Sequence, residues 1–215
     1  MADTIIKHAS KTALTLIAFA LVFTALLAYI FQVTKVPIEK SEAAARLALF
    51  RQIVPASMHN NDILKDTLSI APNDLLGNTQ PSIANRARIN NAPAAIILEA
   101  IAHDGYSGDI KLLIAIKYDG EISGVRVLTH KETPGLGDYI DIAKEDWIKL
   151  FDAESLTKTS DGKLAEKSAD DKWKVKKDGG QFDYMAGATI TPRAVVKAVH
   201  KALKYFDANK QALFA

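Results

Sequence analysis

The sequence predicts an α+β protein in which a single N-terminal transmembrane helix precedes one domain, an antiparallel sheet flanked by helices. Three observations lead to this prediction. Residues 12–34 carry no charge and are mostly Leu, Ala, Ile, Phe and Val. Residues 94–130 contain three apolar, β-branched runs at hairpin spacing. Residues 192–206 repeat apolar side chains every three or four positions, which is typical of an amphipathic helix.

The uncharged run is long enough to cross a bilayer. Its 23 residues would extend about 34 Å as a helix, against roughly 30 Å of hydrocarbon. A secretory signal would have a shorter apolar run followed by small residues at a cleavage site, whereas Ala18-Phe19-Ala20 lies in the middle of this one. We therefore expect an uncleaved anchor in the lipid bilayer after a tail of residues 1–11. Basic residues lie on both sides of the span, so the positive-inside rule assigns no orientation.

Composition excludes several classes of function. The net charge is only +2, with acids and bases interspersed, so there is no basic patch for nucleic acid. The chain has no cysteine, which excludes disulfides, thiolate catalysis and cysteine-ligated iron–sulfur clusters. The five histidines show no metal-ligand spacing. We expect no catalytic side chain and no metal site, and any redox chemistry must come from a bound cofactor.

Residues 35–93 are expected to form a membrane-proximal helix and a connecting region. Pro37 to Val54 has apolar side chains on one face, and Pro55 should end that helix. Residues 56–92 are rich in Asn, Asp and Pro, which predicts loops with one or two strands.

The three apolar runs, Ala94–Ala102, Ile110–Tyr118 and Glu121–His130, predict antiparallel strands. Asp119-Gly120 between the last two is a strong hairpin signal, and Gly105-Tyr106-Ser107-Gly108 forms the first turn.

The segment after the sheet is expected to contain a short helix, a loop and a strand. Glu145–Phe151 reads as a short helix, Thr157–Asp171 as a charged surface loop, and Trp173–Lys176 as a strand that Asp178-Gly179-Gly180 turns back. Trp173 could stack on a ring-shaped cofactor, but a lone Trp in such a strand more often packs in the core.

Two segments carry candidate binding residues. In the first, the small residues Gly187 and Ala188 precede Thr189, and Thr191-Pro192 has the composition of a helix start, with Thr191 as N-cap. A helix N-terminus favours an anion, so a phosphate at Thr189 would be stabilised, with Arg193 in reach. On these residues alone, an ordinary turn before a capped helix remains open.

The second segment follows the third strand. Here one Pro and two Gly make a rigid loop with free N–H groups, although a plain strand-ending turn is equally compatible. His130 at its start is expected to be a hydrogen-bonded strand-end residue. The candidate binding residues of this loop are Glu132, Thr133, Gly135, Leu136 and Gly137.

Both segments resemble motifs of one family. Residues 183–189, Asp-x-x-Ala-Gly-Ala-Thr, resemble the signature at which a flavin transferase joins FMN to threonine through a phosphoester; Ala186 stands where Ser or Thr is usual, at a variable position. Residues 130–137, His-x-Glu-Thr-Pro-Gly-Leu-Gly, resemble the second hallmark of the FMN-binding domain. That domain occurs in the G subunit of Rnf-type electron transport complexes and the C subunit of the sodium-translocating NADH:quinone oxidoreductase. The short chain and N-terminal anchor fit the Rnf-type family better.

The resemblance implies a fold, a cofactor and a setting. Residues 94–206 would be the FMN-binding domain and 207–215 a C-terminal tail. FMN would be attached covalently to Thr189, with Asp183, Gly187, Ala188, Thr191 and the residues of the 132–137 loop around it. The protein would be a single-pass flavoprotein of the bacterial inner membrane with its main domain in the periplasm. It would carry electrons within a multi-subunit, ion-translocating, ferredoxin- and NAD-linked oxidoreductase, and a separate flavin transferase would install the FMN.

Three alternatives remain open at the level of sequence. The chain could be a C-type subunit of the sodium-translocating complex, or a membrane-anchored binding module without a flavin. A stand-alone flavin reductase would need a site for its reductant, and the sequence contains no dinucleotide-binding glycine fingerprint.

Overall fold

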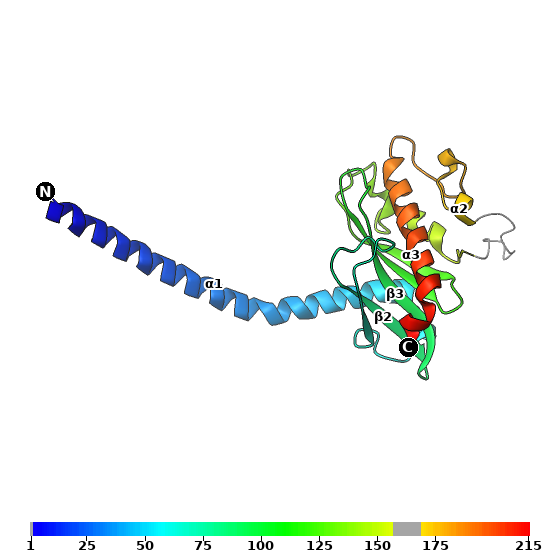
Figure 1. The fold of residues 1–215 in the computed structure, drawn as a ribbon, viewed down its shortest axis with the longest axis horizontal. Helices are drawn as coiled ribbons and strands as arrows, with labels where there is room; N and C mark the ends of the chain where they lie inside the picture. Colours follow the sequence, from blue (N-terminus) through cyan, green and yellow to red (C-terminus); the bar gives the residue numbers. More distant parts are fainter. Residues whose placement is uncertain (1, 157–168) are drawn as a thin grey trace. The chain divides into compact units, whose positions relative to one another are not determined.

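The computed structural model of the chain describes residues 2–156 and 169–215. The chain divides into two compact units, residues 1–46 and residues 47–215. The main elements are the long helix α1 (Ala2–Ile53), a five-stranded sheet and the C-terminal helix α3 (Ile190–Phe214) (Figure 1). Five short helical segments connect them: η1 (Ala56–Met58), η2 (Asp138–Ile140), η3 (Asp146–Phe151), α2 (Ala169–Lys172) and η4 (Lys176–Asp178).

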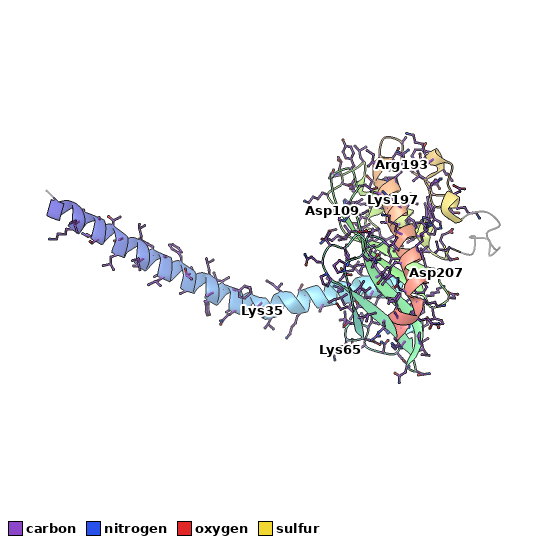
Figure 2. All side chains as sticks on the ribbon, in the orientation of Figure 1. Lys35, Lys65, Asp109, Arg193, Lys197 and Asp207 are labelled. Atoms are coloured by element: carbon purple, nitrogen blue, oxygen red, sulfur yellow. The ribbon has the colours of Figure 1, made fainter. Side chains whose placement is uncertain are left out.

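Helix α1 contains the expected membrane span and continues beyond it. Its apolar part is long and hydrophobic enough to cross a membrane, and its large apolar side chains between Ile6 and Ile38 are exposed and project from the helix on all sides (Figure 2). The expected helix after Pro37 is confirmed as far as Ile53, just before Pro55, but it is continuous with the membrane span, because α1 runs through Pro37. Proline removes one N–H donor from the helix at this point.

The sheet is an antiparallel meander in which sequence neighbours are also spatial neighbours. Its strands are β1 (Thr67–Ile70), β2 (Ser82–Ile89), β3 (Ala92–Ala102), β4 (Ile110–Lys117) and β5 (Ile122–Thr129). The three predicted strands are β3, β4 and β5, and the predicted turn contains Gly120 at a positive φ of 94°. The one or two strands expected in residues 56–92 are β1 and β2, which extend the same sheet.

Successive apolar side chains along the strands point to opposite faces of the sheet, so a core forms on each face. On β3, Ile96, Leu98 and Ala100 belong to the larger core, which α3 covers, whereas Ala95 and Ile97 belong to the smaller one. The end of α1 fills this smaller core with its last apolar residues, Phe50 and Ile53 among them. Both faces are therefore buried, as the nearly continuous apolar composition of β3 and β4 requires.

Polar contacts fix the end of α1 to β5. The Ser123 hydroxyl donates to the carbonyl oxygen of Ile53 at 2.5 Å, and Arg126 donates to the side-chain oxygen of Gln52 at 2.9 Å. The first bond satisfies a carbonyl oxygen at the helix C-terminus, and the second places a cation there, which is also favourable. Gly124 makes the close approach possible, because a Cβ there would lie 2.9 Å from the Cγ2 of Ile53.

The other end of the domain is closed by α3, which continues to Phe214 and so beyond the expected helix end at 206. Arg86 donates to the carbonyl oxygen of Ala215 at 2.6 Å, and Arg88 donates to that of Phe214 at 3.1 Å. Asp66 accepts hydrogen bonds from both guanidinium groups. Burial tends to raise the pKa of Asp66, but these hydrogen bonds and charges outweigh it and lower that pKa. The C-terminus of α3 is thereby held against β2.

The segment between η3 and α3 differs in part from expectation. Glu145–Phe151 is helical as expected, although the helix is of the 3-10 type, η3. The strand expected at Trp173–Lys176 is absent, since Val175 makes only an isolated bridge to Phe182 and η4 begins at Lys176. Trp173 packs in the core, stacked on His200. Most of the loop expected at 157–171 lies outside the described residues.

Replacing Phe50 with Ala should lower the stability of the folded domain. Phe50 is 1% exposed in the smaller core, and replacing such a residue with Ala costs about 3–5 kcal/mol. Thermal unfolding of the detergent-solubilised full chain, followed by circular dichroism, should show a clear fall in Tm for Phe50→Ala. The control is Phe31→Ala, because Phe31 is 66% exposed on the same helix and its Tm should match the wild type. Equal Tm values for all three proteins would mean that the end of α1 does not stabilise the sheet.

Candidate functional site

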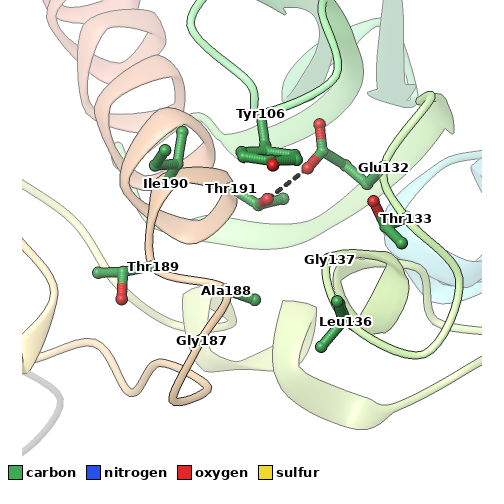
Figure 3. A pocket seen from close by; sticks show the side chains of 10 residues that line it. All are labelled: Tyr106, Glu132, Thr133, Leu136, Gly137, Gly187, Ala188, Thr189, Ile190 and Thr191. Carbon is green, nitrogen blue, oxygen red and sulfur yellow. Dashed lines mark hydrogen bonds between the residues drawn. The ribbon is translucent and has the colours of Figure 1, made fainter.

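One pocket brings together segments that are distant in the sequence. It encloses about 330 Å³ and lies between the turn after β3, the loop after β5 and the start of α3 (Figure 3). Its lining residues are Tyr106, Glu132, Thr133, Leu136, Gly137, Gly187, Ala188, Thr189, Ile190 and Thr191.

The structure places most of the predicted binding residues around this pocket. The exceptions are Asp183, whose exposed side chain forms an ion pair with Lys176 at 2.5 Å, and Gly135, which lies in the loop without lining the pocket. Sequence reasoning missed Tyr106 and Ile190. For Tyr106 a signal existed, since it is an aromatic residue inside a glycine-flanked turn. Ile190 carries no signal, because an apolar residue at a helix start usually faces the core.

Glu132 is the polar centre of the pocket wall. Its carboxylate is only 4% exposed. One oxygen accepts a hydrogen bond from the Ser107 backbone N–H at 3.0 Å, and the other accepts one from the Thr191 hydroxyl. Its own N–H donates to Nδ1 of His130 at 3.1 Å, so His130 is the hydrogen-bonded strand-end residue that was expected. A buried carboxylate needs such donors, because its desolvation is otherwise costly. Glu132 thus joins three segments of the pocket.

Glycine is required where these segments meet. A Cβ on Gly137 would lie 2.8 Å from a carboxylate oxygen of Glu132 and 3.0 Å from the Thr191 hydroxyl. Gly135, by contrast, has open space around it, so a side chain would meet no neighbour there. Glycine is favoured at this position because φ is positive, at 76°. Its N–H donates to the Asp138 carboxylate at 2.7 Å. The 132–137 loop is therefore fixed by close packing at Gly137 and by a hydrogen bond at Gly135.

The start of α3 differs from the sequence prediction. The helix begins at Ile190, and Thr189 occupies the N-cap position without a side-chain capping bond. Thr191 lies inside the first turn, 1% exposed, and donates to Glu132. The prediction that Thr191 is the N-cap is therefore wrong. Its backbone is already helical, and its hydroxyl donates to the buried Glu132 carboxylate in a charge-assisted hydrogen bond.

Arg193 also lies elsewhere than expected. Its guanidinium makes a bidentate pair with Asp178, at 2.5 and 2.6 Å. Of the pocket-lining residues, none is Lys or Arg, and the ionisable side chains are Glu132 and Tyr106. Positive potential in the pocket therefore comes from the N-terminus of α3, where the first N–H groups have no helical carbonyl before them.

An aromatic cluster supports the segment that leads to Thr189. Trp147 donates from Nε1 to the Asp183 carbonyl at 2.8 Å, and the Tyr139 hydroxyl accepts the Met185 N–H at 3.3 Å. The two rings pack edge to face with centroids 5.5 Å apart. Burial raises the pKa of Tyr139 to about 12, so it stays a neutral phenol. Asp183 thus contributes through its backbone to holding this segment, while its carboxylate faces outward.

Comparison with known families identifies two matching regions. The family model of the FMN-binding domain matches residues 105–204, which include every segment of the pocket. The family model of the RnfG N-terminal region matches residues 1–53, which correspond to α1.

Relatives match over nearly the whole chain. The G subunit of the ion-translocating oxidoreductase complex of Vibrio atlanticus is 45% identical over 205 residues, covering 95% of this chain and 93% of the relative. The protein of the same name from Pseudomonas aeruginosa is 47% identical over 206 residues, covering 95% and 92%. That of Shewanella loihica is 43% identical and covers 99% and 94%. Among solved structures, NqrC of Shewanella oneidensis has a TM-score of 0.45 at 20% identity, covering 74% of this chain and 72% of that one.

Removal of the Thr191 hydroxyl should destabilise the domain. Thr191→Val keeps the shape but leaves a buried oxygen of Glu132 without its donor, which costs about 1–3 kcal/mol. The matched control is Thr133→Val, because Thr133 lines the same pocket but its side chain is exposed. Thermal unfolding of the full chain should show a lower Tm for Thr191→Val alone. If both variants unfold with the wild-type Tm, the Glu132–Thr191 contact does not hold the pocket together.

Proposed function

The chain belongs to the G subunits of ion-translocating oxidoreductase complexes, and we propose that it carries electrons there through FMN joined covalently to Thr189 by a phosphoester. One observation carries this proposal: a single pocket brings the 132–137 loop and the Thr189 segment together, although more than fifty positions separate them. Neither segment alone could hold a tethered ring system.

The residues of the pocket suit FMN. A volume of about 330 Å³ lies within the range of roughly 300–1,000 Å³ for small-molecule sites. Apolar side chains that suit the faces of an isoalloxazine ring, Tyr106, Leu136 and Ile190, line it together with a few polar groups. Open space surrounds the Cα of Gly187, where an added Cβ would have no neighbour within 4 Å. A bulky group can therefore approach the chain at Gly187, two residues before Thr189.

Thr189 is better suited to attachment than Thr191. The Thr189 hydroxyl makes no capping hydrogen bond, and it follows two small residues. The Thr191 hydroxyl is buried and donates to Glu132. An enzyme that transfers FMN therefore meets an accessible nucleophile at position 189 and a blocked one at position 191.

The N-terminus of α3 offers backbone N–H donors and a positive potential to the phosphate of an attached FMN. The phosphate of an attached FMN keeps a negative charge, and the N–H groups of Ile190 and Thr191 lie in the first turn of α3. Pro192, the next residue, has no N–H to offer. Because no Lys or Arg lines the described pocket, this helix end is the main source of favourable potential for the anion.

In this proposal the protein's residues hold the cofactor and set its surroundings. FMN, when bound, supplies reversible one- and two-electron chemistry that no side chain of the chain can provide. The pocket walls restrict water around the ring, and the buried Glu132 carboxylate fixes the walls relative to one another. The covalent bond keeps the cofactor in place through every redox state. Electrons then pass from one partner subunit to another, so the chain is a redox subunit without a turnover of its own.

The proposal extends to the setting in which the chain works. The relatives are named as subunits of complexes, so this chain works with other subunits. A separate flavin transferase attaches the FMN, and α1 anchors the protein in the lipid of the bacterial inner membrane with residues 47–215 in the periplasm. The C-type subunit of the sodium-translocating complex is the weaker alternative, because the relatives that cover nearly the whole chain are G subunits.

Replacement of Thr189 should abolish attachment. Thr189→Val keeps the shape of the side chain and removes the nucleophile, so the protein should fold in the membrane without covalent flavin. Each variant is co-expressed with a flavin transferase, and the flavin is detected by fluorescence in a denaturing gel. Mass spectrometry of the wild-type peptide should show the mass of FMN less one water on Thr189.

Two variants serve as controls for this experiment. Thr189→Ser restores a hydroxyl and should be labelled. Thr191→Val should be labelled too, although it is less stable. Unmodified wild-type peptide, from cells whose transferase labels another target, would contradict covalent attachment to this chain.

The domain should lie on the periplasmic side of the membrane. Alkaline phosphatase fused after Ala215 should be active, because it folds only in an oxidising compartment, whereas β-galactosidase at the same position should be inactive. The reverse pattern of activity would place the domain in the cytoplasm.

A further inference from the structure

His103 lies at the base of the turn after β3, residues 103–109, and contacts two oxygen atoms at once. Its Nδ1 is 2.9 Å from a carboxylate oxygen of Asp109, and its Nε2 is 2.7 Å from the carbonyl oxygen of Gly77. A carboxylate and a carbonyl oxygen only accept hydrogen bonds, so each ring nitrogen must donate one. A neutral imidazole has a single N–H, whereas the imidazolium has two. This arrangement therefore requires the charged form of His103.

The Gly77 contact ties the turn to the loop between β1 and β2, residues 71–81. This 71–81 loop packs closely on the end of β3. The Ile101 N–H donates to the Leu76 carbonyl oxygen at 2.8 Å, and a Cβ on Gly77 would lie 2.3 Å from the Ile101 carbonyl oxygen. Gly77 also has a positive φ of 69°, which glycine adopts without strain. The loop is thus placed where its Gly77 carbonyl oxygen meets His103.

Charged side chains from three segments surround His103. They are Asp104 and Asp109 of its own turn, Asp74 of the 71–81 loop, and Lys197 and Lys201 of α3. Lys197 donates to Asp104 at 2.6 Å, so these two charges offset each other. The hydrogen bond to Asp109, followed by the one to Gly77, raises the pKa of His103 by more than desolvation lowers it, and the charges of Asp109 and Asp104 act in the same direction as these bonds.

We propose that His103 is a proton-dependent tie between the turn after β3 and the 71–81 loop, closed while the ring carries two N–H groups and opened when it loses one proton. On that loss Nδ1 keeps its N–H towards Asp109, since a hydrogen bond to a carboxylate is the stronger of the two. Nε2 then presents a lone pair to the Gly77 carbonyl oxygen, so the contact with the loop is lost. The inference goes beyond electron carriage, and it concerns the chain with or without a flavin.

The tie stabilises the domain at low pH and is lost as the pH rises. In the unfolded chain His103 titrates near its ordinary pKa of about 6.5, and in the folded domain its pKa is higher. The contribution to stability is therefore fully present below about pH 6.5 and disappears as the pH passes the folded-state pKa. Its size is modest, because the His103 and Asp109 side chains are 53% and 55% exposed and salt screens such pairs.

Hydrogen exchange of the 71–81 loop in the full-length chain, solubilised in detergent, tests the tie. The amides of Asn73 and Leu76 donate to carbonyl oxygens inside the loop, so their exchange reports its opening. The intrinsic pH dependence of exchange is corrected for. Protection in the wild type should then fall about 2- to 10-fold between roughly pH 6 and pH 8.5, which corresponds to one lost hydrogen bond. His103→Gln should show no such fall, because glutamine does not titrate.

The matched control is His59→Gln. His59 also contacts a backbone carbonyl oxygen, that of Asn61, at 3.2 Å, but it lies in another segment of the domain. The pH-dependent fall in protection of the 71–81 loop should be the same in this variant as in the wild type. A loss of the fall in both histidine variants would overturn the assignment to His103.

A second variant keeps the histidine and changes its partner. Asp109→Asn retains an acceptor but removes the charge, so the fall in protection should move to lower pH. The His103 ring is identified in NMR titrations as the signal missing from His103→Gln. Its midpoint should lie above about 6.5 in the wild type and should be lower in Asp109→Asn.

The remaining outcomes also decide the proposal. Wild-type protection that does not change with pH overturns it, and so does an equal pH-dependent fall in His103→Gln. A wild-type His103 midpoint at or below about 6.5 overturns it as well. If His103→Gln does not fold, Asp109→Asn decides: a fall in protection at lower pH supports the tie, and a fall at the wild-type pH overturns it.

Discussion

The buried carboxylate of Glu132 is the contact on which the pocket depends. It accepts hydrogen bonds from the turn after β3 and from the first turn of α3, and its own backbone belongs to the loop after β5. Because a desolvated carboxylate is costly without donors, all three segments must be in place together. Gly105 and Gly137 allow this, since a Cβ on either would press against the Glu132 side chain. The pocket is therefore one assembled unit.

Helix α3 connects this unit to the rest of the domain. Its middle covers the larger core, its far end is held by Arg86 and Arg88, and its first turn is fixed by Thr191. With both ends held, the N-terminus cannot shift along the sheet, and the position of Thr189 is defined. The same helix thus stabilises the fold and presents the N–H groups that favour a phosphate.

The aromatic cluster beside η3 fixes the approach to Thr189. Trp147 and Tyr139 bind backbone groups of residues 183 and 185, so the segment before the pocket is ordered without regular secondary structure. Glycine at 187 then gives the chain a positive φ of 90° and leaves space beside it. Rigid support before Thr189 and open space at Gly187, two residues earlier, suit the proposed attachment of FMN to this hydroxyl.

The sequence by itself determined the membrane helix, the central strands and the two motif segments, because each depends on local composition, periodicity or spacing. Residues 12–34 and the Asp119-Gly120 hairpin are recognisable without any knowledge of distant contacts. Only the tertiary structure decided what Thr191 and Arg193 do. Thr191 has the composition of a cap, yet it binds Glu132, 59 positions away; Arg193 pairs with Asp178. The place of Tyr106 in the pocket wall was equally hidden, since hydrogen bonds, ion pairs and exposure depend on neighbours in space that local sequence patterns do not encode.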